Sequence, residues 1–249
     1  MSDSSAIAHG GVQAAEHGHS PHLHHQFESV KQQADAGNLA MWLFILTEVM
    51  FFGGLFTVYM VYRNWYYRAF VAASHQLDWK LGAINSVLLI TSSFTMALAV
   101  RSAQLRRKSA LIMFLIVTFV LGFVFLGIKG TEYKEKWEKH HIPGSHYSLQ
   151  SFLHPSTDPV AKAAGDKQLP LDIARKTEVY FSLYFAMTGL HALHMLIGMG
   201  IILFMIFRAR SDAYTTGNAA YVEYFGLYWH FVDIIWIFLF PLLYLINRH

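Results

Sequence analysis

The chain has 249 residues, of which 54% are hydrophobic and only 14% are charged, whereas a soluble domain carries roughly a quarter of charged residues. This composition is typical of a membrane protein, and the small formal net charge of +3 gives no sign of a nucleic-acid-binding surface. The chain contains no cysteine, which excludes disulfides, thiolate metal sites and cysteine nucleophiles.

Residues 1–38 form a polar, histidine-rich tail. It lacks the charged start, apolar core and cleavage site of a secretory signal, so we expect the first apolar segment to remain in the mature protein. Two interpretations of the tail stay open, a metal-binding segment and a solvated, partly disordered one. The second is favoured because a polar tail has little apolar surface to bury. The clustered histidines are His17, His19, His22, His24 and His25.

The first three membrane spans are predicted at about 39–62, 81–100 and 110–130, because each is an apolar run long enough to cross a bilayer as a helix. Asn38 is placed to cap the start of the first span, and Glu48 lies near its middle. An aromatic belt at the far end of that span marks the membrane boundary. Its members are Tyr59, Tyr62, Trp65, Tyr66 and Tyr67. Small residues typical of close helix contacts are Gly53 and Gly54, and the pairs Gly82/Ser86 and Ser93/Ala97.

The rest of the chain is predicted to form an extramembrane loop at 131–177, then spans at 178–207 and 223–247. The loop is too hydrophilic to cross a membrane, and the fourth span is long enough to tilt or to project from the bilayer. The loop histidines are His140, His141, His146 and His154. Since no repeat or linker interrupts it, we expect 39–249 to form one five-helix membrane domain.

Positive charges in the two even-numbered loops predict the orientation. Arg101, Arg106, Arg107 and Lys108 lie between the second and third spans, and Arg208 and Arg210 follow the fourth. By the positive-inside rule both loops face the cytoplasm, so the N-terminus is expected inside and the C-terminus outside.

Ionisable side chains within or beside the apolar spans are costly in hydrocarbon and therefore mark structural or functional features. His230 and Asp233 lie three residues apart, so they can hydrogen-bond each other or one neighbouring helix. The full set comprises Glu48, Glu132, His191, His194, His230 and Asp233.

Three functions compete to explain these residues. A haem–copper centre needs more histidines than the spans offer, and a single bis-histidine haem is disfavoured because His191 and His194 share one helix turn. A transporter would show an inverted repeat and broken helices, which this sequence lacks. The third candidate is an accessory subunit, whose polar groups lock helices together beside the proton entrance of a partner. For each residue alone, structural hydrogen bonding is the safer interpretation.

Five segments, one on each predicted span, resemble segments of subunit III of haem–copper oxidases in order and spacing. The resemblance runs from about residue 39 to the end and is to the short, five-helix bacterial form. The segments are TEVMFFGGLF (47–56), INSVLLITSS (84–93), LGFVFLGIKGTEY (121–133), TGLHALHMLIGMG (188–200) and YWHFVDIIWIFLF (228–240).

The resemblance implies an all-α, V-shaped bundle of five transmembrane helices with a lipid-holding cleft. It implies docking onto oxidase subunit I, with subunit II nearby, and it places the haems and copper in those partners. This chain would hold no metal, only phospholipid. The six ionisable residues match polar motif positions of the family, and Arg208 matches an arginine that contacts a lipid phosphate. Lys129 departs from the family, whose residue there is usually uncharged.

The function that the resemblance implies is a non-catalytic subunit III of a bacterial aa3- or caa3-type cytochrome c oxidase in the inner membrane. It would support subunit I stability, lipid binding and proton uptake. The alternatives are subunit III of a quinol oxidase and an accessory subunit of a nitric oxide reductase. Because the resemblance puts the first and fourth spans side by side, we also predict that Glu48 hydrogen-bonds His191 or His194.

Overall fold

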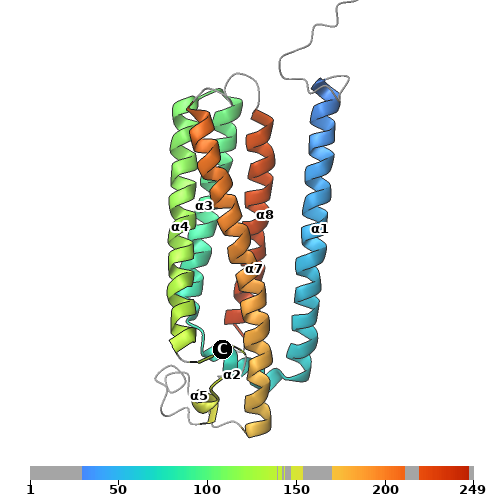
Figure 1. Ribbon diagram of the computed structural model, residues 1–249, viewed down its shortest axis with the longest axis vertical. Helices are drawn as coiled ribbons and strands as arrows, with labels where there is room; N and C mark the ends of the chain where they lie inside the picture. The colour runs from blue at the N-terminus through green and yellow to red at the C-terminus, as the bar shows by residue number, and fades with distance from the viewer. Residues whose placement is uncertain are drawn as a thin grey trace, which may run out of the picture. The chain divides into compact units, whose positions relative to one another are not determined.

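The computed structural model describes residues 30–138, 140–141, 143, 147–153, 170–210 and 219–246, and within these residues it contains helices and loops but no strand. The histidine-rich tail, His146 and His154 therefore lie outside the described residues. Figure 1 shows the helices. They are α1 (Val30–Trp65), α2 (Tyr67–His75), α3 (Trp79–Gln104), α4 (Lys108–Glu138), α5 (Gln150–Leu153), α7 (Leu171–Ala209) and α8 (Ala219–Tyr244).

Five of these helices, α1, α3, α4, α7 and α8, are long and apolar enough to cross a membrane. The predicted all-α membrane fold with five spans is therefore confirmed. The chain divides into two units, Met1–Ala40 and Met41–His249, and the second contains most of α1 and all the other helices. The V shape that the resemblance implies stays a prediction.

The predicted helix ends are wrong at three places. Helix α1 begins at Val30, so Asn38 lies inside the helix and does not cap it. Helix α4 continues to Glu138 and α7 begins at Leu171, so the predicted loop 131–177 starts and ends in helix. The reason is physical: hydropathy marks where a helix leaves the apolar phase, whereas residues such as lysine and glutamate continue a helix into water.

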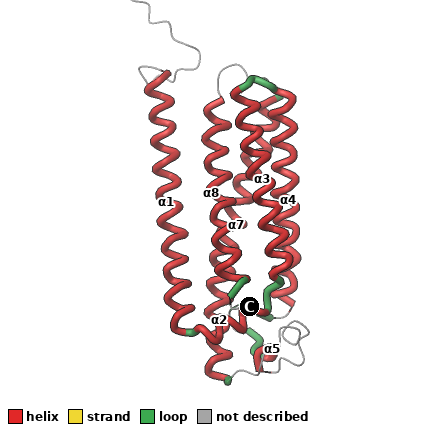
Figure 2. The backbone as a smooth tube through the Cα atoms, turned by 180° about the vertical axis from the view of Figure 1, so that it is seen from behind, coloured by secondary structure: helices red, strands yellow, loops and turns green. Residues whose placement is uncertain are grey.

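The core lies among α3, α4, α7 and α8, which stand side by side in both views (Figures 1 and 2). Helices α3 and α4 are antiparallel neighbours joined by a tight turn. Arg106 in this turn has a φ of 55°, its N–H bonds Ala103 O, and the N–H of Arg107 bonds Ser102 O. This is the Schellman pattern that closes the last carbonyls of α3.

Glycines allow close approach at some predicted contacts and not at others. A Cβ added at Gly82 would lie 2.8 Å from the ring of Phe240, and Trp236 Nε1 donates to Ser86 Oγ at 3.2 Å, so the contact predicted for the Gly82/Ser86 pair is confirmed. In the other predicted pair, Ser93 contacts His230 on α8 but Ala97 is exposed. At Gly53 and Gly54 no described residue lies within 4 Å of such a Cβ, so the close approach predicted there is not made within the described part of this chain.

Helix α1 joins the other helices through long aromatic side chains, not through close backbone approach. Phe52 meets the rings of His194 and Phe231 at 5.5 and 6.4 Å, and the hydroxyl of the fully buried Tyr59 donates to Leu242 O. Only 6% of the most apolar window of α1 is buried, against 56% in α8. Most of the α1 surface is thus left for lipid or for another protein.

Candidate functional site: polar groups buried in the bundle

Glu48 on α1 faces His194 on α7, with 3.2 Å between Oε2 and Nε2. The predicted proximity to a histidine of the fourth span is confirmed for His194. The hydrogen bond itself is absent, because Oε2 has no partner of bonding geometry among the described residues. Both side chains are largely but not fully buried, at 20% and 15% exposure.

The hydrogen bond of the other ring nitrogen of His194 determines how many protons the contact with Glu48 needs. Nδ1 lies 2.8 Å from Leu190 O, and because a carbonyl only accepts, Nδ1 carries a hydrogen. Nε2 is then an acceptor in the neutral ring. An attractive contact with Glu48 therefore needs one more proton, which either the carboxyl or the imidazole can hold.

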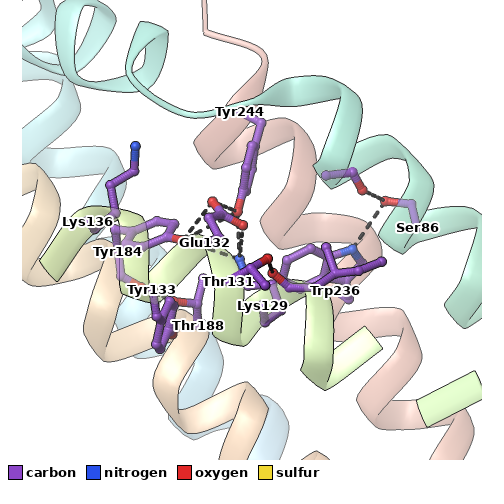
Figure 3. Close-up of polar contacts among 12 residues, drawn as sticks. Ser86, Lys129, Thr131, Glu132, Tyr133, Lys136, Tyr184, Thr188, Trp236 and Tyr244 are labelled. Atoms are coloured by element: carbon purple, nitrogen blue, oxygen red, sulfur yellow. Dashed lines mark hydrogen bonds and ion pairs between the residues drawn. The ribbon is translucent and has the colours of Figure 1, made fainter. Parts of the chain in front are cut away.

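Lys129 and Glu132 form an ion pair inside the bundle, one turn apart on α4 (Figure 3). Lys129 Nζ lies 2.8 Å from Glu132 Oε2, and the side chains are only 4% and 2% exposed. Two tyrosines complete the cluster, Tyr184 from α7 and Tyr244 from α8. The four residues are called the Lys129 cluster below.

Every polar atom of the Lys129 cluster has a partner. Lys129 Nζ donates to Glu132 Oε2 and to the hydroxyls of Tyr184 and Tyr244, at 2.8, 3.2 and 2.7 Å, which uses all three ammonium hydrogens. The two hydroxyls in turn donate to Glu132 Oε1, at 2.9 Å and 2.6 Å. Nζ also lies 4.9 Å from the ring centroid of Trp236. A buried ion pair is tolerable when its remaining donors and acceptors are satisfied in this way.

The cluster contains one residue that the sequence analysis selected, Glu132, and one that it noted only as a departure, Lys129. Tyr184 and Tyr244 were not predicted from the sequence. A usable signal was present: Tyr180, Tyr184, Thr188 and His191 recur every three or four residues and form a polar stripe along an apolar helix.

His191 lies apart from Glu48, enclosed by aromatic rings. Its ring is 5.5 Å from that of Phe125 and 5.3 Å from that of Trp236. It is 1% exposed, and neither ring nitrogen has a hydrogen-bond partner among the described residues. The two histidines that the sequence pairs in one motif therefore have different surroundings.

Of the two options predicted for His230 and Asp233, a hydrogen bond between them is not formed. His230 Nδ1 lies 2.6 Å from Ser93 Oγ on α3, and neither oxygen of Asp233 makes a hydrogen bond within the described part of the chain. Both side chains nevertheless face α3, where Ser93 is close to each. The second predicted option, a hydrogen bond to one neighbouring helix, is therefore confirmed for His230 and not for Asp233.

Arg208 lines a cavity of about 320 Å³ near the end of α7. The other walls are apolar or aromatic and come from α7 and α8. They are formed by Ile201, Phe204, Met205, Tyr221 and Phe225. A guanidinium at the rim of an apolar cavity fits a phospholipid, whose phosphate it can bind while the chains lie on the apolar walls.

Polar groups outside the spans include a half-buried tyrosine. Tyr147 hydrogen-bonds Thr177 at 2.7 Å, and burial raises the pKa of the Tyr147 hydroxyl. Among the residues that the structure describes, no three histidine, aspartate or glutamate side chains are grouped closely enough to hold a metal ion.

Five apolar helices with polar groups buried between them define a multi-pass α-helical membrane protein. The profile of the family described as Cytochrome c oxidase subunit III matches residues 168–247. The chain is 28% identical to "Cytochrome c oxidase subunit 3" of Synechocystis sp. over 82% of this chain and 73% of that protein. It is 28% identical to the protein of the same description from Thermostichus vulcanus, over 84% and 87%. It is also 23% identical to "Probable quinol oxidase subunit 3" of Staphylococcus saprophyticus, over 90% and 98%. The C-terminal third of the chain thus matches the family model, and most of its length is similar to subunit 3 proteins of cytochrome c and quinol oxidases.

Proposed function

We propose that this chain is the non-catalytic subunit III of a bacterial aa3- or caa3-type cytochrome c oxidase, acting in aerobic electron transport and proton translocation. The observation that carries the proposal is the similarity to oxidase subunits along more than four-fifths of the chain. The redox centres, haems and copper, belong to partner subunits I and II in this proposal. The membrane histidines are used otherwise: His194 faces Glu48, His230 binds Ser93, and aromatic rings enclose His191.

The proposed work of the chain is to stabilise subunit I and to support proton uptake. The sparsely buried surface of α1 offers an area on which a partner can dock. Glu48 and His194 are the strongest candidates for a proton-related role, because they share a protonation requirement and are not fully buried. Glu132 has a structural role in this proposal. His191, His230 and Asp233 are proposed to belong, with Glu48 and His194, to the polar and proton-related residues of the spans.

We propose phospholipid as the ligand of the Arg208 cavity. The proposed site is the bacterial inner membrane, with the N-terminus in the cytoplasm. Support for this orientation comes from the grouping of positive charge: Lys108 Nζ donates to Arg210 O at 2.6 Å, so the two basic loops lie at the same end of the bundle.

A quinol oxidase subunit III is the second candidate, because relatives with that description match 88–90% of this chain. Purification of the native complex through an affinity tag on this chain tests both candidates. Oxygen uptake driven by reduced cytochrome c, with haems and copper in co-purifying subunits, is expected. Uptake driven by quinol alone would transfer the assignment to the second candidate. Recovery of the chain without any haem-containing subunit would contradict both.

A further inference from the structure

A second cavity, of about 350 Å³, lies at the opposite end of α7, where α1 turns into α2. Its walls on one side are Trp65, Tyr66 and Tyr67, together with Arg68 at the start of α2. Asp172, Ile173 and Lys176 from the first turns of α7 close the other side. No part of the proposed oxidase function assigns a role to this cavity.

The aromatic walls place this cavity at headgroup depth. Tyr and Trp gather where a helix leaves the hydrocarbon, because their rings are apolar and their tips polar. Tyr66 stacks on Tyr62 with 6.1 Å between ring centroids, and Trp65 meets Tyr62 edge-on at 5.8 Å, so the aromatic wall is supported from behind. Trp65 itself is 66% exposed and faces the surroundings of the bundle.

The cavity presents two cations that no carboxylate neutralises. Arg68 and Lys176 are exposed, and within the described part of the chain neither has a carboxylate at ion-pairing distance. Lys176 Nζ lies 5.0 Å from the centroid of the Tyr66 ring, which holds it over the cavity wall. Asp172 is the one acidic residue of the lining, so the wall carries a net positive charge.

We propose that this cavity binds the phosphate headgroup of an anionic phospholipid. Arg68 meets the phosphate through its fork of N–H donors, and Lys176 adds a second charge. The acyl chains follow the exposed face of α1 made by Val58, Val61 and Trp65, which are spaced three and four residues apart and so lie on one side of the helix.

The length of α7 supports a lipid in each leaflet. Lys176 and Arg208 are 32 residues apart on this helix, which is about 48 Å at 1.5 Å per residue. A bilayer measures roughly 40–45 Å across with its headgroups. A tilted α7 therefore brings Arg208 to one headgroup layer and the Arg68–Lys176 cavity to the other.

The test counts lipids retained by the purified complex, or by the full-length chain, after reconstitution in nanodiscs of phosphatidylcholine containing one-fifth phosphatidylglycerol. Native mass spectrometry compares the wild type with Arg68→Gln/Lys176→Gln. The matched control is Lys80→Gln/Arg175→Gln, which removes two exposed cations at the same end of the bundle without touching the cavity lining. Circular dichroism confirms equal helix content for all three proteins.

Each cation near an anionic lipid contributes roughly fivefold to binding, so the double variant is expected to hold phosphatidylglycerol roughly 25-fold more weakly. The single change Arg68→Gln should weaken the binding of phosphatidylglycerol roughly fivefold. The control variant and phosphatidylcholine retention should be unchanged. An equal loss of phosphatidylglycerol in the control variant would show that diffuse surface charge causes the effect, and it would refute the proposed site. Displacement by millimolar inorganic phosphate would instead indicate a free-anion site, and an unchanged double variant would also refute the proposal. None of these outcomes depends on the electron donor of the oxidase.

Discussion

At the residue scale, the Lys129 cluster is the feature whose effect on the stability of the bundle can be argued most directly. An ammonium and a carboxylate are held almost fully out of solvent, and each hydrogen bond that they need comes from the other or from Tyr184 and Tyr244. Such a cluster is robust when complete and fragile when any one member is removed, because the partner charge is then left buried and uncompensated.

Lys129→Met is expected to destabilise the bundle by about 3–5 kcal/mol, because it leaves Glu132 buried without its counter-charge. The quadruple change Lys129→Met, Glu132→Leu, Tyr184→Phe and Tyr244→Phe should recover most of that loss, because no unpaired polar group remains. Thermal unfolding of the purified subunit in detergent measures both. The control is Lys134→Met, which breaks the exposed pair with Glu138 and should change little. Equal costs for the lysine variants would contradict the cluster as a stabilising unit.

Glu48→Gln is expected to be milder than Glu48→Ala, because an amide N–H can still donate to Nε2 of His194. The alanine variant leaves Nε2 without any polar group of residue 48 facing it, at a cost of about 1–3 kcal/mol. Double-mutant cycles by thermal unfolding separate the two histidines of the motif. Glu48→Ala should couple with His194→Phe and be additive with His191→Phe, which lies among aromatic rings elsewhere. Coupling to His191 alone would refute the observed pairing.

At the element scale, the packing of α7 against α8 depends on which glycines of α7 lie directly against side chains of α8. A Cβ at Gly198 would lie 2.8 Å from the ring of Trp229, whereas one at Gly200, two residues along α7, would meet no described residue within 4 Å. Gly198→Ala should therefore cost about 1–3 kcal/mol through overpacking. Gly200→Ala should be neutral or stabilise by about 0.5–1 kcal/mol, since alanine favours the helix. A lowered melting temperature is expected for Gly198→Ala and an unchanged or raised one for Gly200→Ala, and equal destabilisation by the two variants would argue against this packing.

The turn between α3 and α4 supplies a second test at this scale. Arg106 adopts a left-handed conformation, which costs a residue with a side chain about 1–2 kcal/mol and glycine nothing. Arg106→Gly should accordingly raise the melting temperature, and Arg106→Val should lower it. Arg107→Gly is the control, because this neighbour has no positive φ and gains no such relief. A destabilised Arg106→Gly would mean that the charge of the side chain matters more than its backbone.

Much of the fold, but little of the site geometry, could be predicted from the sequence. Apolar length alone identified the five spans, because bilayer thickness fixes how much chain must be apolar. It could not identify the ends of α1, α4 and α7, where polar residues continue the helix. Nor could spacing decide that His194 faces Glu48 while His191 turns towards Trp236, since three residues along a helix rotate a side chain by most of a turn.

At the scale of the whole molecule, the basic loops define one end of the bundle, and the absence of native cysteine makes that end easy to locate. We expect a membrane-impermeant maleimide to label Asn64→Cys, at the end of α1, in cells whose outer membrane is opened. Arg107→Cys, in the exposed turn after α3, should react only after the inner membrane is also permeabilised. The reverse pattern would invert the proposed topology, and the unsubstituted chain serves as the unlabelled control.

The internal pairing of Lys129 with Glu132 has an electrical consequence for a protein in an energised membrane. A lone charge that crosses a bilayer gains or loses about 2.3 kcal/mol for each 100 mV of membrane voltage. The two opposite charges lie 2.8 Å apart and sum to zero, so the same voltage acts only on their small dipole. That amounts to about 0.2 kcal/mol per 100 mV even when the dipole is aligned with the field across a hydrocarbon core of roughly 30 Å. The contact that the Lys129 cluster makes between α4, α7 and α8 should therefore be equally stable in the presence and in the absence of a membrane potential.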